Sequence, residues 1–292
     1  PCGRRLGRDG TPRVVPPSSR FRGERELVAD VAICAIHGTG GEDGALLGAL
    51  ELAGVPYVGG GVGPAAVAMD KALAKLVFRD AGLVVNPHTL LDRDEFVAGP
   101  EATAARAAAQ GMPCYVKPLS LGSSIGVSRC ASEAELTEAL ELCFELDRRA
   151  LVEPALDEAI EINVAVLGRP GGELRVSVLE QPVKAEGALS FEDKYLRGGD
   201  KTGGSKGEGG AKGGGSKGDG GGMASQDRLI PAPIPEALAE EIRAAAERAH
   251  RALGFAGVVR YDFLVHPHAG PGEGVVLNEG NTVPGSFALS LF

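Results

Sequence analysis

The feature that most restricts the fold is an apolar run over residues 27–36 that stops at a glycine-rich turn, residues 37–44. A short run rich in valine and alanine and bounded by a turn predicts a buried strand. A helix is expected to follow, with an apolar face made by Leu46, Leu47, Leu50 and Leu52. A strand, a glycine-rich loop and a helix in succession are typical of α/β folds, in which ligands often bind where the loop meets the helix.

The same mixture of helical and strand-like segments continues to the end of the chain. Helices are expected over residues 64–82, 102–111, 133–147 and 235–254, the third opened by a capping box of Ser132 and Glu135. Strands are expected over residues 56–58, 114–116, 150–153, 160–167, 173–180, 257–265 and 274–279. The fold class predicted is therefore mixed α/β, with a linker at Pro87 that leads into a second unit.

Residues 198–222 form a low-complexity tract in which GGSKGEGG recurs as GGSKGDGG. Glycine-rich polar sequence buries too little apolar surface to offset the entropy of ordering, so a mobile loop is predicted. Composition alone favours two interpretations equally, an inert linker and an expanded lid over an active site.

Composition narrows the class of protein. The formal net charge of −9 argues against a nucleic-acid-binding protein, which would usually carry a basic face. The five cysteines are odd in number and form no CxxC pair, so buried free thiols in a reducing compartment are expected. The sequence has neither an apolar run long enough to span a bilayer nor the apolar core of a signal peptide. These observations predict a soluble cytoplasmic protein.

A first group of residues suits phosphate binding. Lys117 is followed by a glycine- and serine-rich loop over residues 122–126. A lysine supplies a point charge for phosphate, and the backbone N–H groups of such a loop can surround its oxygens. The lysine precedes the glycines, so this is not the Walker arrangement. A plain hairpin loop with similar glycines is the alternative.

A second group suits a divalent cation. Asp262 lies inside one expected strand and Glu279 ends the next, close to Asn281. Charged groups in apolar strands are costly unless they are paired or bind metal, and oxygen ligands suit Mg²⁺. Arg260 shares a strand face with Asp262 and could meet the same anionic intermediate. Ordinary ion pairs on an exposed strand face are the alternative. His37, a lone histidine after a strand, is by itself more consistent with a structural role.

Five motifs in this order resemble those of the D-alanine–D-alanine ligases, members of the ATP-grasp superfamily. They are HGTGGEDG at residues 37–44, MDK at 69–71, KP and GSSIG at 117–126, DKYL at 193–196, and RYD with NEGNTVPGS at 260–262 and 278–286. The resemblance covers about residues 27–292.

This resemblance implies an ATP-grasp fold preceded by a partial N-terminal doubly wound α/β domain. Residues 1–26 would be irregular, 27–86 the partial substrate domain, 87–155 the central ATP-grasp subdomain, and 156–292 the C-terminal subdomain with the 198–222 insert in its omega loop. The opening strand and glutamate-bearing helix of the family have no counterpart in residues 1–27, and the C-terminal helix expected after Ser286 is absent.

The resemblance also assigns roles to residues. ATP would be bound by Lys71, Lys117, Ser124, Glu153, Leu156, Glu161 and Lys194, with Glu153 at the adenine and Glu161 at the ribose. Two Mg²⁺ or Mn²⁺ ions would be bound by Asp262, Glu279 and Asn281. The catalytic residues implied are Arg260, Ser123, Tyr195 and Gly285, and those at the substrates are His37 and Ser290.

The reaction implied is ATP-dependent joining of two D-alanines through an acyl phosphate, for peptidoglycan precursor synthesis. Tyr195 follows Lys194, and a tyrosine at this place accompanies D-alanine as the second substrate in the family that the sequence resembles. D-serine as the acceptor, another acid and amine, and a chain that binds nucleotide without turnover remain as alternatives. The family implies a homodimer with D-alanine and ATP as its ligands, without nucleic acid or membrane insertion.

Overall fold

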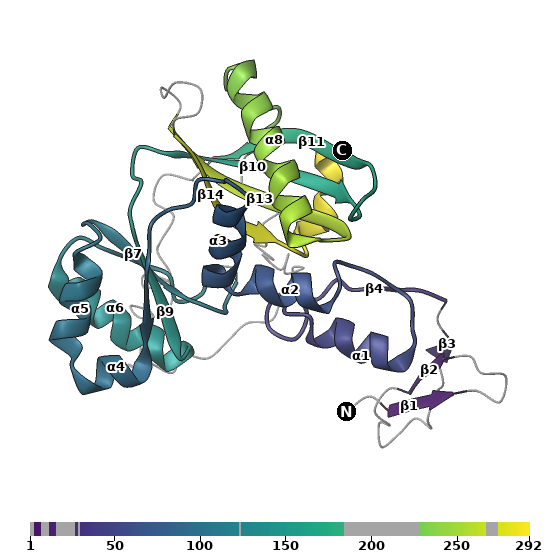
Figure 1. Ribbon diagram of the computed structural model, residues 1–292, viewed down its shortest axis with the longest axis horizontal. Helices are drawn as coiled ribbons and strands as arrows, with labels where there is room; N and C mark the ends of the chain where they lie inside the picture. Colours follow the sequence, from purple (N-terminus) through teal and green to yellow (C-terminus); the bar gives the residue numbers. More distant parts are fainter. Residues whose placement is uncertain are drawn as a thin grey trace, which may run out of the picture.

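The computed structural model describes residues 3–6, 12–15, 27–28, 30–122, 124–183, 228–266 and 274–292 (Figure 1). Ser123, Lys194, Tyr195 and the tract at 198–222 lie outside the described residues. Figure 1 shows a smaller sheet with helices on one side, a larger sheet on the other, and helix α3 (Lys71–Asp80) between them. No helix in the described ranges is long and apolar enough to cross a membrane.

The smaller sheet has four antiparallel strands in the order β6 (Thr89–Asp92), β9 (Arg149–Pro154), β7 (Cys114–Pro118) and β8 (Ser128–Cys130). Three helices accompany it: α4 (Arg93–Ala98), α5 (Pro100–Ala108) and α6 (Glu133–Leu146). Apolar side chains of α5 and α6 share one core with alternate residues of the strands. Because strand side chains alternate between faces, the other face is left for polar residues.

Helix α6 shows how local sequence sets these boundaries. The Ser132 side chain accepts from the Glu135 N–H at 3.3 Å, which confirms the predicted cap. Glu135 in turn accepts from the Ala131 N–H at 2.8 Å, one residue earlier than a standard capping box would require.

The larger sheet has five antiparallel strands in the order β12 (Arg228–Leu229), β11 (Leu174–Pro182), β10 (Ile160–Gly168), β13 (Gly257–Val265) and β14 (Val275–Asn281). Helix α8 (Glu236–Leu253) packs its predicted apolar face on one side of this sheet. The 3-10 segment η3 (Gly285–Leu291) packs on the opposite side, where Ala288 and Leu291 meet Ala165. The strands and the long helix predicted for this region are therefore confirmed.

The N-terminal part contains β1 (Gly3–Leu6), β2 (Pro12–Val15), β3 (Leu27–Val28), β4 (Ala32–Ile33), α1 (Ala45–Ala53), β5 (Tyr57–Val58) and α2 (Val62–Met69). The prediction of one buried strand over residues 27–36 is wrong. Ile33 is 63% exposed, and within the described residues β4 pairs with β5 alone. An apolar run is buried only where neighbouring elements cover it, and here one face lacks that cover.

The single helix predicted over residues 64–82 is also wrong. It is divided into α2 and α3 (Lys71–Asp80) at Asp70, whose backbone is extended. The Asp70 carboxylate accepts from the N–H groups of Ala72 and Leu73, at 3.1 and 3.0 Å. An aspartate that caps in this way ends one helix and begins the next, because its side chain supplies an acceptor that the helix start lacks.

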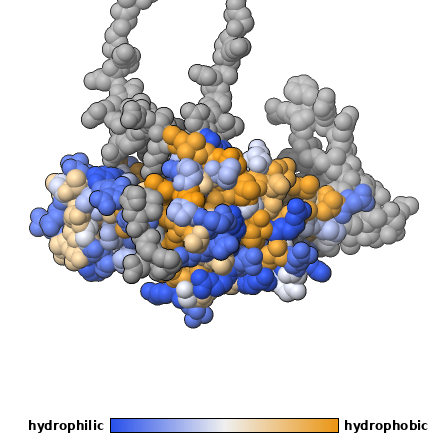
Figure 2. All heavy atoms as spheres, turned by 90° about the horizontal axis from the view of Figure 1, so that it is seen from above, coloured by the Kyte–Doolittle hydropathy of each residue, from blue (hydrophilic) through white to orange (hydrophobic). Residues whose placement is uncertain are grey.

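Helix α3 joins the two sheets into one body. Its Phe78 lies in the core of the larger sheet with Tyr261, their ring centroids 6.3 Å apart. The segment after it runs along β14, where the Leu277 N–H donates to the Val84 carbonyl at 2.9 Å. Figure 2 shows apolar side chains gathered near the middle of one face, while the smaller sheet presents a mainly hydrophilic surface.

Candidate functional site

The first part of the site lies where α3 packs against the second face of the smaller sheet. Tyr115 of β7 is the direct partner of Glu153 on β9, and Lys117 follows two residues later on the same face. The Lys117 ammonium donates to Glu153 Oε1, and to Asn278 Oδ1 of β14 at 3.2 Å. This second contact connects the smaller sheet to the larger one.

Glu153 has a second cation behind it. Lys75 of α3 places its Nζ atom 3.1 Å from Glu153 Oε2. The approach lacks hydrogen-bond alignment, because neither atom has a hydrogen-bond partner within the described residues. Burial opposes ionisation of Glu153, but the two lysines outweigh it and hold the pKa of this carboxyl below its usual value. Lys75, Lys117 and Glu153 form a cluster with a net positive charge, because one carboxylate lies between two ammonium groups.

Lys71 connects the start of α3 to the loop that follows Lys117. Its Nζ atom donates to the carbonyls of Pro118, at 3.3 Å, and Leu121, at 2.5 Å. Burial lowers the pKa of Lys71, and the nearby Glu279 carboxylate opposes that shift. The predicted lysines are therefore close together, because Lys71 binds the loop that begins directly after Lys117.

The loop itself turns tightly after Gly122. The Ile125 N–H donates to the Gly122 carbonyl at 3.2 Å, and Ser124 is exposed with a left-handed φ of 56°. Gly126, at a φ of +70°, has no room for a Cβ, which would lie 2.6 Å from Leu146 Cδ1. This glycine is needed both for its backbone conformation and for its packing.

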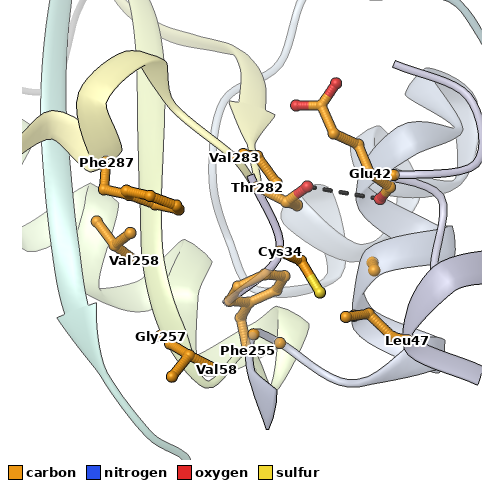
Figure 3. A pocket seen from close by; sticks show the side chains of 14 residues that line it. Cys34, Glu42, Leu47, Val58, Phe255, Gly257, Val258, Thr282, Val283 and Phe287 are labelled. Atoms are coloured by element: carbon orange, nitrogen blue, oxygen red, sulfur yellow. Dashed lines mark hydrogen bonds between the residues drawn. The ribbon is translucent and has the colours of Figure 1, made fainter. Parts of the chain in front are cut away.

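Glu42 approaches this loop from the glycine-rich turn. Its carboxylate accepts from the Gly38 N–H at 2.5 Å, and a Cβ built on Gly122 would lie 3.7 Å from Glu42 Oε2. Figure 3 shows this carboxylate turned away from the apolar pocket formed by Cys34, Leu47, Val58, Phe255, Val258 and Phe287. The Thr282 hydroxyl lies 3.5 Å from the Glu42 backbone carbonyl, which links the turn to the segment after β14.

The second part of the site lies on β13 and β14. Arg260 donates to both oxygens of Asp262, at 2.6 and 2.7 Å, which confirms that the two share a strand face. Glu279 is the direct cross-strand partner of Asp262, and Asn281 is that of Arg260. Burial raises the pKa of Asp262 to about 7, against the lowering effect of Arg260, and the Glu279 charge adds to the increase.

These residues fit a divalent cation by chemistry and by position. Asp262 and Glu279 are neighbouring carboxylates whose charges repel, and Asn281 supplies an amide oxygen on the same strand as Glu279. Oxygen donors of this kind suit Mg²⁺, and a cation would offset the repulsion. Within the described ranges, no group of three His, Cys, Asp or Glu residues could hold a metal. A cation at this position would therefore also need the Asn281 amide oxygen and oxygens from a bound ligand.

A small cavity beside Arg260 brings together three of the predicted residues, Arg260, Gly285 and Ser290. Glu180 and Arg228 also line it, and their charged groups lie 3.3 Å apart. The Ser290 side is formed by η3, where Ser286, Phe287 and Ala288 adopt left-handed backbone angles that are strained for side chains with a Cβ.

The remaining predicted residues are more scattered. His37 is exposed after β4, and Leu156 is half-buried in the turn between β9 and β10. Glu161, on β10, lies near enough to raise the pKa of Asp262. Sequence reasoning missed Lys75, and it gave no role to Asn278 or Glu42 although both lie within the motifs that it singled out. The only sequence signal for Lys75 was its place one helical turn after Lys71, on the side of α3 that carries buried Ala72 and Phe78.

The family described as "D-ala D-ala ligase C-terminus" matches residues 77–205 and 222–292. The chain belongs to this family. The D-alanine–D-alanine ligase of Methylobacterium sp. (strain 4-46) is 39% identical over 265 residues, which are 90% of this chain and 62% of that relative. The D-alanine–D-alanine ligase of Thermoanaerobacter sp. (strain X514) is 33% identical over 293 residues, covering 98% and 73% of the two chains.

Solved structures of ligases agree with this assignment. The VanG D-Ala:D-Ser ligase from Enterococcus faecalis superposes with a TM-score of 0.71 at 29% identity, over 96% of this chain and 72% of that one. The D-alanine–D-alanine ligase from Coxiella burnetii gives 0.68 at 27%, over 96% and 68%. The predicted ATP-grasp fold is thus confirmed. The chain spans 62% and 65% of the length of its relatives from Methylobacterium and Chlorobium chlorochromatii (strain CaD3).

Proposed function

We propose that the protein joins two D-alanines to D-alanyl-D-alanine, with conversion of ATP to ADP and phosphate. The observation that carries this proposal is the hydrogen bond from Lys117 Nζ to Asn278 Oδ1, 3.2 Å long. It brings Lys117, the lysine that we propose to bind phosphate, next to the strand of Glu279 and Asn281. Cationic and anionic groups thus face one another where phosphate and metal would be shared.

The positive cluster would bind the nucleotide phosphates. Lys117 is the lysine of the cluster that is open to the site, while Lys71 holds the carbonyls of the phosphate loop. We assign the phosphates to Lys71, Lys117, Ser124 and Lys194, and the adenosine to Glu153, Leu156 and Glu161. Ser123 and Tyr195 are proposed to border the reacting carboxylate, although they lie outside the described residues.

Arg260 would act at the acyl centre. The first D-alanine carboxylate oxygen attacks the γ-phosphorus of ATP, ADP leaves, and an acyl phosphate forms. The amine of the second D-alanine then attacks the acyl carbon, the C–O bond to phosphate breaks, and the ammonium proton is lost. The Arg260 guanidinium and the Gly285 N–H lie where they could stabilise the oxyanion that develops. His37 and Ser290 are proposed to contact the amino acids.

Asp262, Glu279 and Asn281 would hold the divalent cation. Bound Mg²⁺ supplies charge neutralisation between ATP oxygens and the carboxylates. Asp262 would then depend on both the cation and Arg260 to remain ionised in its buried position.

The proposal extends to the setting of the reaction. The dipeptide would enter peptidoglycan precursors, and we propose a cytoplasmic homodimer. The domain division at residues 27–86, 87–155 and 156–292 is likewise proposed.

Phosphate release with ATP, Mg²⁺ and single amino acids tests this function. We expect release that requires D-alanine, does not occur with L-alanine, and yields one D-alanyl-D-alanine per phosphate by mass spectrometry. ATP hydrolysis that is indifferent to D-alanine, or that yields no dipeptide, would contradict the proposal. Because one similar structure is a D-Ala:D-Ser ligase, a mixture with D-serine should be measured in the same assay.

A further inference from the structure

The two lysines around Glu153 lie at different depths. The Lys117 side chain is 15% exposed, whereas those of Lys75 and Glu153 are each 2% exposed. Lys117 also reaches across to Asn278 on the other sheet. Glu153 therefore has one cation in front, at the opening of the site, and one behind, inside the protein.

Lys75 has no other evident purpose in this structure. It extends from the buried side of α3, and within the described ranges Glu153 is the one carboxylate that pairs with it. Its ammonium lies 3.1 Å from Glu153 Oε2 and has no other acceptor among the described residues. Burying a lysine against a single carboxylate is costly, so its burial there needs a compensating gain.

That gain follows from what the front lysine must do. If Lys117 binds nucleotide phosphate, it has to leave Glu153 or share its charge with the ligand. A buried carboxylate that loses its only counter-ion is strongly disfavoured, and it also repels the incoming phosphate. A second cation that cannot reach the phosphate removes both penalties.

We propose that Lys75 is a positioning residue that keeps Glu153 compensated while Lys117 turns to the nucleotide phosphates. This inference rests on the proposed nucleotide-binding function. Lys75 touches no ligand. Because the cation that it frees from Glu153 is Lys117, which is proposed to bind phosphate, removing Lys75 should weaken ATP binding more than adenosine binding.

The test compares two ligands on the full chain, ATP by isothermal titration calorimetry and adenosine by ligand-observed NMR. In Lys75→Met, Glu153 retains Lys117 as its only counter-ion. We expect ATP to bind about tenfold more weakly, because its phosphates must now compete with that ion pair. Adenosine should change by less than threefold. Unchanged ATP affinity, or an equal loss for both ligands, would overturn the proposal.

Three further variants keep the result interpretable. Arg79→Met removes a cation from the exposed side of the same helix, and it should leave ATP affinity within twofold of the wild-type value.

Glu153→Gln, alone and combined with Lys75→Met, completes the cycle. Because Glu153 is itself proposed to contact the adenosine, the double variant is compared with Glu153→Gln and not with wild type. The double variant should fold even if Lys75→Met does not. The two should bind ATP within about twofold of each other, because without the Glu153 charge Lys75 has nothing to compensate. If the double variant binds ATP tenfold more weakly than Glu153→Gln, Lys75 does not act through Glu153.

The wild-type titration separates the two claims. If the unmodified chain binds no ATP, the proposed function fails, and this inference fails with it. If it binds ATP and Lys75→Met binds equally well, only the role of Lys75 is rejected.

Discussion

Glu153 in the smaller sheet and Asp262 in the larger sheet are both buried carboxylates paired with cations, yet their environments differ. Glu153 lies between two lysines, which keep its pKa low. Asp262 has one arginine and faces a second carboxylate, Glu279, and burial raises its pKa to about 7. One site has an excess of positive charge and the other an excess of negative charge.

The difference suits the proposed ligand, an anionic nucleotide accompanied by a divalent cation. An excess of lysines suits phosphate oxygens, and an excess of carboxylates suits a divalent cation that itself binds phosphate. Lys117 and Asn278 bring the two regions into contact at 3.2 Å. The smaller sheet then contributes the positive charge and the larger sheet the negative charge.

Removing charge from the negative region should have the largest effect. Glu279→Gln keeps the shape of the side chain but leaves a cation with one carboxylate fewer. We expect phosphate release with D-alanine to fall by about 10³-fold, because neutralisation of transferring phosphate is the main source of rate enhancement in such reactions. Steady-state kinetics over a range of Mg²⁺ concentrations measures this.

A matched control is Glu173→Gln, an exposed glutamate in the turn between β10 and β11. It should retain wild-type activity. Full activity in Glu279→Gln would remove Glu279 from the metal site and end the contrast between the regions.

Removing charge from the positive region should have the next largest effect. Lys117→Met leaves Glu153 paired with Lys75, so the fold should survive. We expect kcat/KM for ATP to fall by about 10²-fold, because a direct charge contact to phosphate is lost. The same kinetics measured against ATP concentration test this. An unchanged KM and kcat would show that phosphate binds elsewhere.

The stability of the fold in acid depends on a third buried group as well as on the two carboxylates. Its contribution has to be measured before any loss of stability is assigned to Glu153 or Asp262. Burial lowers the pKa of His250 to about 4, and its ring lies 3.3 Å from the Tyr261 hydroxyl. The His250 ring is protonated near pH 6.5 in the unfolded chain but only near pH 4 in the folded chain. The folded state should therefore lose roughly 2 to 3 kcal/mol as pH falls through this window.

Urea unfolding between pH 7 and pH 4 measures that loss. His250→Gln removes the titrating ring while keeping a polar partner for Tyr261, so its stability should fall less steeply over the same range. Parallel curves for the variant and the wild type would assign the acid sensitivity to other groups.

The smallest effect concerns a carboxylate outside both regions. Asp70 caps α3 and pairs with Arg149, which is 42% exposed, at 2.8 Å. Asp70→Ala should cost about 1 kcal/mol, mostly through loss of the cap. Asp70→Asn keeps the cap and should cost less than about 1 kcal/mol, because exposed ion pairs contribute little. Thermal unfolding distinguishes them; an equal loss in both variants would mean that the ion pair matters more than the cap.

Sequence reasoning succeeded where local signals were sufficient. The cap at Ser132, the apolar face of α8 and the shared face of Arg260 and Asp262 all follow from residue type and spacing. It failed where the outcome depends on distant parts of the chain. Ile33 is exposed because a neighbouring layer does not cover it.

The candidate site divides in the same way. Motifs predicted Lys117, Asp262 and Glu279, because those residue types suit phosphate and metal. Lys75 was missed, since a lysine in a helix normally points to solvent and its burial depends on Glu153, 78 positions later in the chain. Such a pairing follows from the fold, and no local pattern of residues indicates it.

Both regions are proposed to act on one phosphate, which passes from ATP to the carboxylate of the first D-alanine. D-Alanine labelled with ¹⁸O in its carboxylate tests this, because that oxygen attacks the γ-phosphorus and leaves with phosphate when the amine attacks. We predict one ¹⁸O atom in each phosphate released with dipeptide, measured by mass spectrometry. Unlabelled phosphate released alongside dipeptide would contradict it.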